Sequence, residues 1–231
     1  MAVNKSAVVC HSGGMDSSIC LAMAIQEWGA DRVLSMGFDY GQRHSEEHRR
    51  AQQICDAWGV DRVVVPVSAL AEITEDALTN HALPIDHPEG APPTTLVMGR
   101  NGLMARLAAI HAAHIQADCI YMGVIQVESD NSGYRDCSRE YMDHMQTVLR
   151  MDLDSNTFEI RTPVVSMTKQ QTMRAAHALG VLEFLLDVTI TCYRGIPHAG
   201  CQDCPACDLR NEGIRKFLQD EPDFQMPFSL S

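Results

Sequence analysis

Short apolar runs alternate with longer stretches of helical periodicity along most of the chain. Ser6–His11 is an apolar run of strand length, and Ser17–Trp28 then places apolar side chains at helical spacing. The same succession predicts a strand over Arg32–Phe38, a helix over Ser45–Trp58 and a strand over Asp61–Val67. Alternating strands and helices predict an α/β fold, doubly wound around a mostly parallel sheet with helices on its faces.

The alternation resumes after an irregular interruption. Residues 68–93 contain four prolines and little periodicity, which predicts a long irregular segment near the site. Beyond it the pattern predicts strands over Cys119–Val124 and Phe158–Arg161. It also predicts three helices, over Asn101–Gln116 with Asn101 as the N-cap, over Asp136–Leu149, and over Thr168–Leu179.

The last forty residues have a different composition, dominated by cysteine and glycine. We therefore expect residues 1–187 to form the α/β domain and residues 188–231 to form a small subregion packed on it. A length of 231 residues with 45% hydrophobic side chains suits one sizeable domain of this kind.

The charge balance narrows the range of partners. The chain has 18 basic and 30 acidic residues, a net charge of −12, and only three lysines. Because contact with a phosphate backbone requires Lys and Arg, this balance argues against a nucleic-acid partner. With neither an export signal nor an apolar run of membrane-spanning length, we expect a soluble, cytoplasmic protein that makes no membrane contact.

The first predicted strand ends in a glycine-rich loop, Cys10–Ser18. Its Gly13-Gly14 pair lets the backbone approach a ligand, and the following helix adds the positive end of its dipole. The loop has neither the lysine of the Walker pattern nor the third glycine of the dinucleotide fingerprint. We predict a phosphate-binding loop of another kind; the alternative is a structural glycine turn without a ligand.

Four cysteines near the carboxyl end have the spacing of a metal site. Two Cys-x-x-Cys steps and a fourth thiol suit tetrahedral zinc in a closed, structural site. An iron–sulfur cluster is the main alternative, and disulfides are the weaker one. The predicted zinc ligands are Cys192, Cys201, Cys204 and Cys207.

Three polar stretches follow or precede predicted elements where a ligand would bind. Residues 38–44, 99–101 and 128–137 should meet beyond the carboxyl ends of the strands. Arg100 could bind phosphate or carboxylate there, and the acidic side chains could bind Mg²⁺ or an N–H edge. Taken singly, each stretch is more often a solvated loop than a site. Lys169 could be a phosphate contact or a surface charge.

The motif Ser-Gly-Gly-x-Asp-Ser after a strand resembles the PP-loop of ATP pyrophosphatases. The motifs Phe-Asp-Tyr-Gly-Gln-Arg-His, Gly-Arg-Asn and Thr-Cys-Tyr-x-Gly-Ile follow in order, with the cysteine tail. Together they resemble the 7-cyano-7-deazaguanine synthase (QueC) family over nearly the whole chain. The resemblance implies a Rossmann-like PP-loop domain, ATP with Mg²⁺, one structural Zn²⁺ and a homodimer.

The resemblance also implies a reaction and a set of site residues. The reaction is an ATP-dependent ligation of ammonia to 7-carboxy-7-deazaguanine that gives 7-cyano-7-deazaguanine through adenylated acid and amide intermediates. Asp16, Arg100 and Lys169 would be catalytic. ATP would be bound by Cys10, His11, Ser12, Gly13, Gly14, Asp16, Ser17, Ser18 and Phe38. The substrate would be bound by Gln42, Arg43, His44, Asn101, Asp130, Tyr134 and Asp136.

The chain departs from the usual family pattern beside the expected substrate. Met98 stands where the family usually has proline, and Arg135 and Ser138 replace a proline and an arginine. An enzyme that stops at the amide or acts on another deazapurine partner therefore stays open. So does a PP-loop enzyme that modifies tRNA.

Overall fold

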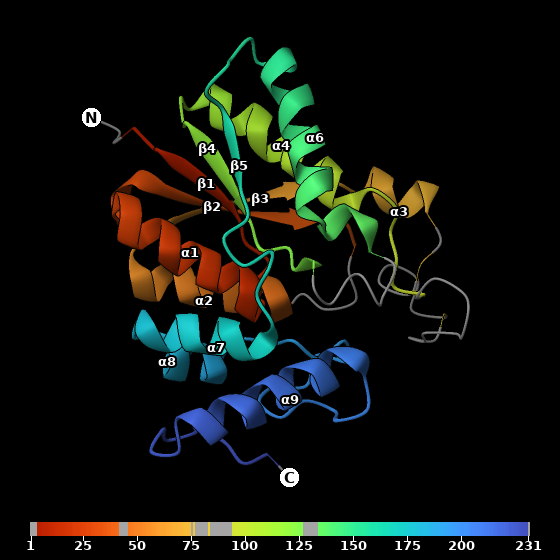
Figure 1. Ribbon diagram of the computed structural model, residues 1–231. Coiled ribbons are helices and arrows are strands. Elements are labelled where there is room, and N and C mark those ends of the chain that lie inside the picture. Colours follow the sequence, from red (N-terminus) through yellow and green to blue (C-terminus); the bar gives the residue numbers. More distant parts are fainter. Residues whose placement is uncertain are drawn as a thin grey trace.

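A five-stranded parallel sheet forms the centre of the computed structural model, which describes residues 4–41, 46–74, 76, 83, 94–126 and 134–230. The strand order is β3-β2-β1-β4-β5 (Figure 1). The predicted α/β fold with a parallel sheet is confirmed. The strands are β1 (Ala7–Cys10), β2 (Val33–Asp39), β3 (Asp61–Pro66), β4 (Cys119–Met122) and β5 (Glu159–Arg161).

Helices cover both faces of this sheet, as Figure 1 shows. One core lies between the sheet and α1 and α2 and continues into α7, α8 and α9, which pack beyond those two helices; a second core lies between the sheet and α4 and α6. No helix in the described part of the chain is long and apolar enough to cross a membrane. The helices are α1 (Met15–Trp28), α2 (Glu46–Trp58), α3 (Ala69–Ile73), α4 (Arg100–His114), α6 (Arg139–Asp152), α7 (Lys169–Ala178), α8 (Leu182–Val188) and α9 (Pro205–Asp220).

Two predicted helix starts are wrong. α4 begins one residue earlier than predicted, with Gly99 as its N-cap in the left-handed region (φ 69°), so that Asn101 lies inside the first turn. α6 begins at Arg139 rather than at residue 136, because the Ser138 side chain caps it by accepting from the Tyr141 N–H. A short 3₁₀ helix, Arg135–Cys137, precedes that cap.

Two helices near the carboxyl end, α8 and α9, were missed. α9 starts with Pro205 in its first turn, a favoured position, and its buried Ile214 and Phe217 lie three residues apart on one face. This face packs against α7. The cysteine-rich composition before Pro205 hid an ordinary amphipathic pattern after it. The proposed division of the chain between residues 187 and 188 stays a prediction.

The strand order locates the site. The chain builds β1, β2 and β3 in one direction and then places β4 on the other side of β1. Ligands of doubly wound folds bind beyond the strand ends at such a reversal. Gly123, just after β4, faces the start of α1 here. A Cβ on Gly123 would lie 2.8 Å from the Ser17 Cα, so only glycine allows this close approach.

Candidate active site

The glycine-rich loop connects β1 to α1 at the strand-order reversal. Gly13 has a φ of +91°, and a Cβ there would lie 2.6 Å from the Glu47 carbonyl oxygen. The N-cap of α1 is Gly14, and within the described residues no side chain caps that helix. The first N–H groups of α1 therefore have the positive potential and the open valence that bind an anion.

The serine hydroxyls hold this loop in shape. Ser17 Oγ donates to the Gly14 carbonyl (3.0 Å) and lies 3.1 Å from Ser12 Oγ. Ser18 Oγ donates to the same carbonyl at 2.8 Å. Ser17 and Ser18 are buried, whereas Ser12 is exposed. Of the three hydroxyls, Ser12 is the one placed to meet a ligand from solvent.

His11 is buried directly beneath the loop. Its Nδ1 lies 3.0 Å from Ser35 Oγ and its Nε2 lies 3.0 Å from Ser18 Oγ. The backbone N–H of His11 donates to the Met36 carbonyl, and the backbone carbonyl of His11 accepts from Arg62 Nη1 at 3.0 Å. Burial, and then the positive charge of Arg62, lower the pKa of His11 to about 3. His11 thus supports the loop through neutral hydrogen bonds; its expected contact with ATP stays a prediction.

This buried imidazole predicts an acid-sensitive fold. In the unfolded chain His11 binds a proton below its ordinary pKa of 6.5, whereas in the folded protein it stays neutral down to about pH 3. Stability should therefore fall as the pH drops through that window. Between pH 7 and pH 5, we expect the unfolding free energy of His11→Phe to fall by about 2 kcal/mol less than that of the unsubstituted protein. Urea unfolding at the two pH values measures this difference.

The matched control is His144→Phe, because the side chain of His144 is 81% exposed. This control should keep the full loss of stability between the two pH values. Equal pH dependence of His11→Phe and the unsubstituted protein would contradict a neutral, buried His11.

Asp16 and Lys169 form an ion pair beside the loop. Lys169 Nζ lies 2.8 Å from Asp16 Oδ2, and the two side chains are 13% and 25% exposed. Lys169 is the first residue of α7, so its largely covered ammonium group faces α1 rather than an open surface. Asp16 Oδ1 is buried and has no hydrogen-bond partner among the described residues. An unpartnered carboxylate oxygen of this kind suits Mg²⁺.

A second polar group surrounds Arg100, the first residue of α4. Its guanidinium carbon lies 5.8 Å from the centre of the Tyr40 ring. Burial alone would lower the pKa of Arg100, but the neighbouring Tyr40 and Asp136 raise it overall. Asp136 Oδ2 also accepts from the Asn101 N–H at 2.9 Å and so caps α4. The residue after β2, the start of α4 and the 3₁₀ helix Arg135–Cys137 therefore lie together here.

Tyrosines from three segments complete this second group. The hydroxyl of Tyr134 forms a hydrogen bond with that of Thr95. Burial, and then the neighbouring Tyr134, raise the pKa of Tyr193 above its ordinary value, while the charge of Arg100 opposes that rise. Tyr40 and Tyr193 were not among the predicted site residues. Their position within the quoted motifs, next to Asp39 and Cys192, was the available signal.

Cys137 belongs to the second group, where the Asn101 side-chain amide donates to its sulfur at 3.3 Å. Burial, and then the negative charge of Asp136, raise the pKa of this thiol to about 12, and the charge of Arg100 opposes the rise. Of the other predicted site residues, Phe38 and Cys10 lie in β2 and β1. Gln42, Arg43, His44 and Asp130 lie outside the described residues.

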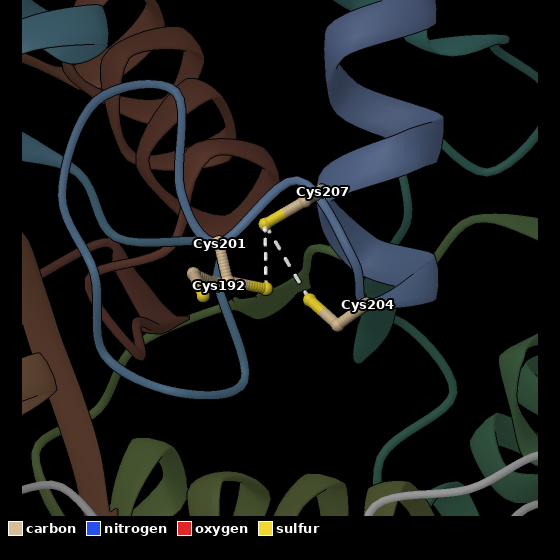
Figure 2. Close-up of side chains that lie close together, drawn as sticks. All are labelled: Cys192, Cys201, Cys204 and Cys207. Carbon is tan, nitrogen blue, oxygen red and sulfur yellow. Dashed lines mark hydrogen bonds between the residues drawn. The ribbon is translucent and has the colours of Figure 1, made fainter.

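The four cysteines predicted as metal ligands lie together (Figure 2). Their sulfur atoms are all within 4.8 Å of one another; Cys207 Sγ lies 3.4 Å from Cys204 Sγ and 3.9 Å from Cys201 Sγ. Tetrahedral Zn–S bonds of about 2.3 Å would place sulfurs about 3.8 Å apart. Arg210 is only 3% exposed, and its charge faces these sulfurs. The cluster could hold a metal ion, with Arg210 balancing thiolate charge.

A family model for "Queuosine biosynthesis protein QueC" matches residues 6–218. The chain belongs to the QueC family. The QueC family is part of the PP-loop superfamily, and this chain is an ATP-using enzyme of the carbon–nitrogen ligase type. The family match includes both the glycine-rich loop and the group around Arg100, because it runs from β1 into α9.

Three solved structures are similar to this QueC-family chain at low sequence identity, and the one with a TM-score of 0.50 supports a shared fold. U34-tRNA thiolase NcsA from Methanococcus maripaludis with its 4Fe-4S cluster has 12% identity and a TM-score of 0.50, over 94% of this chain and 66% of that one. NMN synthetase from Francisella tularensis has 12% identity and a TM-score of 0.49, over 98% and 89%. NH3-dependent NAD synthetase from Campylobacter jejuni, in complex with the nitrate ion, has 14% identity and a TM-score of 0.46, over 98% and 89%.

Proposed function

We propose that this QueC-family protein converts 7-carboxy-7-deazaguanine and ammonia into 7-cyano-7-deazaguanine, with ATP consumed at both the acid and the amide stage. One observation carries the proposal beyond family membership. Asp16 Oδ1 is buried at the phosphate-binding loop and has no hydrogen-bond partner among the described residues, and this loop lies at the strand-order reversal where doubly wound folds bind their ligands.

The chemistry requires activation of an oxygen atom that otherwise leaves poorly. Attack by the carboxylate oxygen on the α-phosphorus of ATP expels pyrophosphate and gives a mixed anhydride. The N–H groups of α1 and the hydroxyl of Ser12 would bind the phosphates, and Lys169 would neutralise charge on the transferring group. Arg100 would hold the carboxylate. In this proposal the protein supplies positioning and charge rather than a covalent nucleophile.

Substrate recognition would fall to residues around Arg100. Tyr134 and Asn101 offer a hydroxyl and an amide beside Arg100, and the buried Asp136 accepts N–H groups, as it does from the Asn101 backbone. The residues proposed from the family resemblance but outside the described part of the chain are Gln42, Arg43, His44 and Asp130.

Two bound metal ions belong to the proposal. Mg²⁺ would accompany ATP, with the unpartnered Asp16 Oδ1 as a protein ligand. A structural Zn²⁺ would be held by the four cysteine thiolates, whose separations fit its tetrahedral geometry. A homodimer and a cytoplasmic location complete what we propose from the family, and light scattering of the purified protein would test the dimer.

The test is to incubate pure protein with ATP, Mg²⁺, ammonium and 7-carboxy-7-deazaguanine and to identify products by mass. Formation of the nitrile, with pyrophosphate released at both stages, is the expected result. The amide as final product would show an enzyme that stops halfway. Unchanged acid together with ATP turnover stimulated by tRNA would overturn the proposal in favour of RNA modification.

A further inference from the structure

Arg62 on β3 contacts the start of the phosphate-binding loop. In the register of β2 and β3 it pairs with Ser35, and its Nη1 donates to the Ser35 hydroxyl at 2.7 Å. The same nitrogen donates to the backbone carbonyl of His11, the residue that follows β1, at 3.0 Å. A Cβ on Gly37 would lie 3.1 Å from the guanidinium carbon, so the guanidinium lies against the backbone of β2. Hydrogen bonds and close packing therefore locate the side chain of Arg62.

A chain of hydrogen bonds connects Arg62 to the N-cap of α1. Ser35 Oγ lies 3.0 Å from His11 Nδ1, and His11 Nε2 lies 3.0 Å from Ser18 Oγ. Ser18 Oγ in turn lies 2.8 Å from the Gly14 carbonyl oxygen. The three residues between the two ends of the chain are no more than 1% exposed. The chain thus runs through the protein interior from β3, across β2 and β1, to the first turn of α1.

The two ends of this chain fix its direction. A carbonyl oxygen accepts only, so Ser18 gives its single hydroxyl hydrogen to Gly14 and must accept from His11 Nε2–H. Burial, and then the charge of Arg62, lower the pKa of His11 to about 3, so the ring carries one proton at neutral pH. His11 Nδ1 is then an acceptor, and the Ser35 hydroxyl donates to it while accepting from Arg62.

Arg62 opposes the reversed direction of the chain. In the reversed chain His11 Nδ1 would carry the proton, yet Arg62 Nη1, which has donors only, lies 3.5 Å from this nitrogen. Ser18 would then donate to His11 Nε2 and release the Gly14 carbonyl. The Cys55 thiol, 3.8 Å from Nδ1, is a weak donor and a weak acceptor and favours neither direction.

The position of Arg62 is not one that stability alone explains. Its Nε and Nη2 are buried and have no hydrogen-bond partner among the described residues, and within that part of the chain it forms no ion pair. A buried donor without a partner lowers stability. A cation kept under these conditions at the base of a ligand-binding loop favours a role in binding.

Building on the proposed ATP site, we infer that Arg62 is a positioning residue for the phosphates of ATP, acting through His11 and Ser18. The directed chain holds the Gly14 carbonyl, and with it the N-cap of α1, so that the first N–H groups of this helix face the ligand. Arg62 itself acts on the loop from within the fold and does not touch the nucleotide.

The first test measures ATP affinity by titration calorimetry with Mg²⁺, which requires no acid substrate. For Arg62→Met we expect affinity to fall on the order of tenfold, about the value of one hydrogen bond. The KM for ATP should rise by the same factor, with kcat nearly unchanged. Arg62→Lys keeps a charge and a donor and should recover part of the affinity. The matched control is Arg32→Met, because Arg32 is exposed before β2; it should bind ATP normally.

A second test observes the direction of the chain. Nitrogen NMR of protein labelled with ¹⁵N-histidine, with the His11 signals assigned by their loss in His11→Phe, distinguishes the two ring nitrogens. At pH 7 we expect the proton on Nε2 in the unsubstituted protein and in Arg32→Met. Arg62→Met should show shifts averaged between the two tautomers. A purely structural role of Arg62 would not move this signal.

The inference and the proposed function fail in different ways. A proton on His11 Nδ1 in the unsubstituted protein, or an Arg62→Met variant with unchanged tautomer and ATP affinity, would overturn the inference. If Arg62→Met does not fold, Ser35→Ala decides, because it removes one link and leaves Arg62 in place. Unchanged tautomer and affinity in Ser35→Ala would also overturn the inference. If the protein binds ATP but leaves 7-carboxy-7-deazaguanine unconverted, the proposed function is wrong while the inference stands on these two measurements.

Discussion

Asp16→Asn should lower acid-dependent pyrophosphate release on the order of 10²- to 10³-fold, a loss typical of removing one charge-stabilising group from an active site. The substitution keeps the shape of the side chain but removes the negative charge that holds Lys169 at 2.8 Å and that would bind Mg²⁺ through Oδ1. Because both side chains keep some contact with water, we expect the unfolding free energy to change by no more than about 1 kcal/mol.

The matched control for this prediction is Asp61→Asn. Asp61 also pairs with a lysine, Lys5, at 2.6 Å, but its side chain is 77% exposed at the start of β3. This control should release pyrophosphate at the unsubstituted rate. If Asp16→Asn loses stability in proportion to its activity, or if both variants lose activity equally, the catalytic placement of Asp16 is wrong.

Cys207→Ala should release the bound metal and lower the unfolding free energy by several kilocalories per mole. Cys207 is fully buried at the first turn of α9, and its sulfur lies 3.4 Å from that of Cys204 and 3.9 Å from that of Cys201. Metal binding contributes directly to the folding of a segment that has few apolar residues of its own. Elemental analysis and thermal unfolding of the same preparations check both effects.

Cys119→Ala is the control here, because Cys119 is equally buried but lies in β4, within the first core. It should lose some stability and no metal. Iron in the unsubstituted protein, with the visible absorption of a cluster, would replace zinc by an iron–sulfur site. Metal-free protein of full stability would contradict a metal site altogether.

The fold was predictable from the sequence wherever one physical signal dominated. Apolar runs such as Ala7–Cys10 are buried in the sheet, and the helical spacing of α1 and α2 reflects one face packed on it. The start of α4 was not predictable from composition. Asn101 is a good capping residue, yet Asp136, thirty-five residues away, supplies the carboxylate that accepts its N–H. A cap supplied from a distant segment leaves no local pattern.

The site was predictable as a meeting of strand ends but not as a set of contacts. Strand order decides that residue 40, residue 100 and residues 134–137 converge, and topology rules anticipate this. That Lys169 pairs with Asp16 depends on how α7 and α1 pack, and the two residues are 153 positions apart.

The position of Tyr193 matters for truncated forms of this protein. It is bonded to Cys192 in sequence and meets Tyr134 and the field of Arg100 in space. A chain truncated at residue 187 would keep the proposed phosphate-binding loop but would lose Tyr193 from the group around Arg100. We therefore expect such a truncation to lower turnover more than nucleotide affinity.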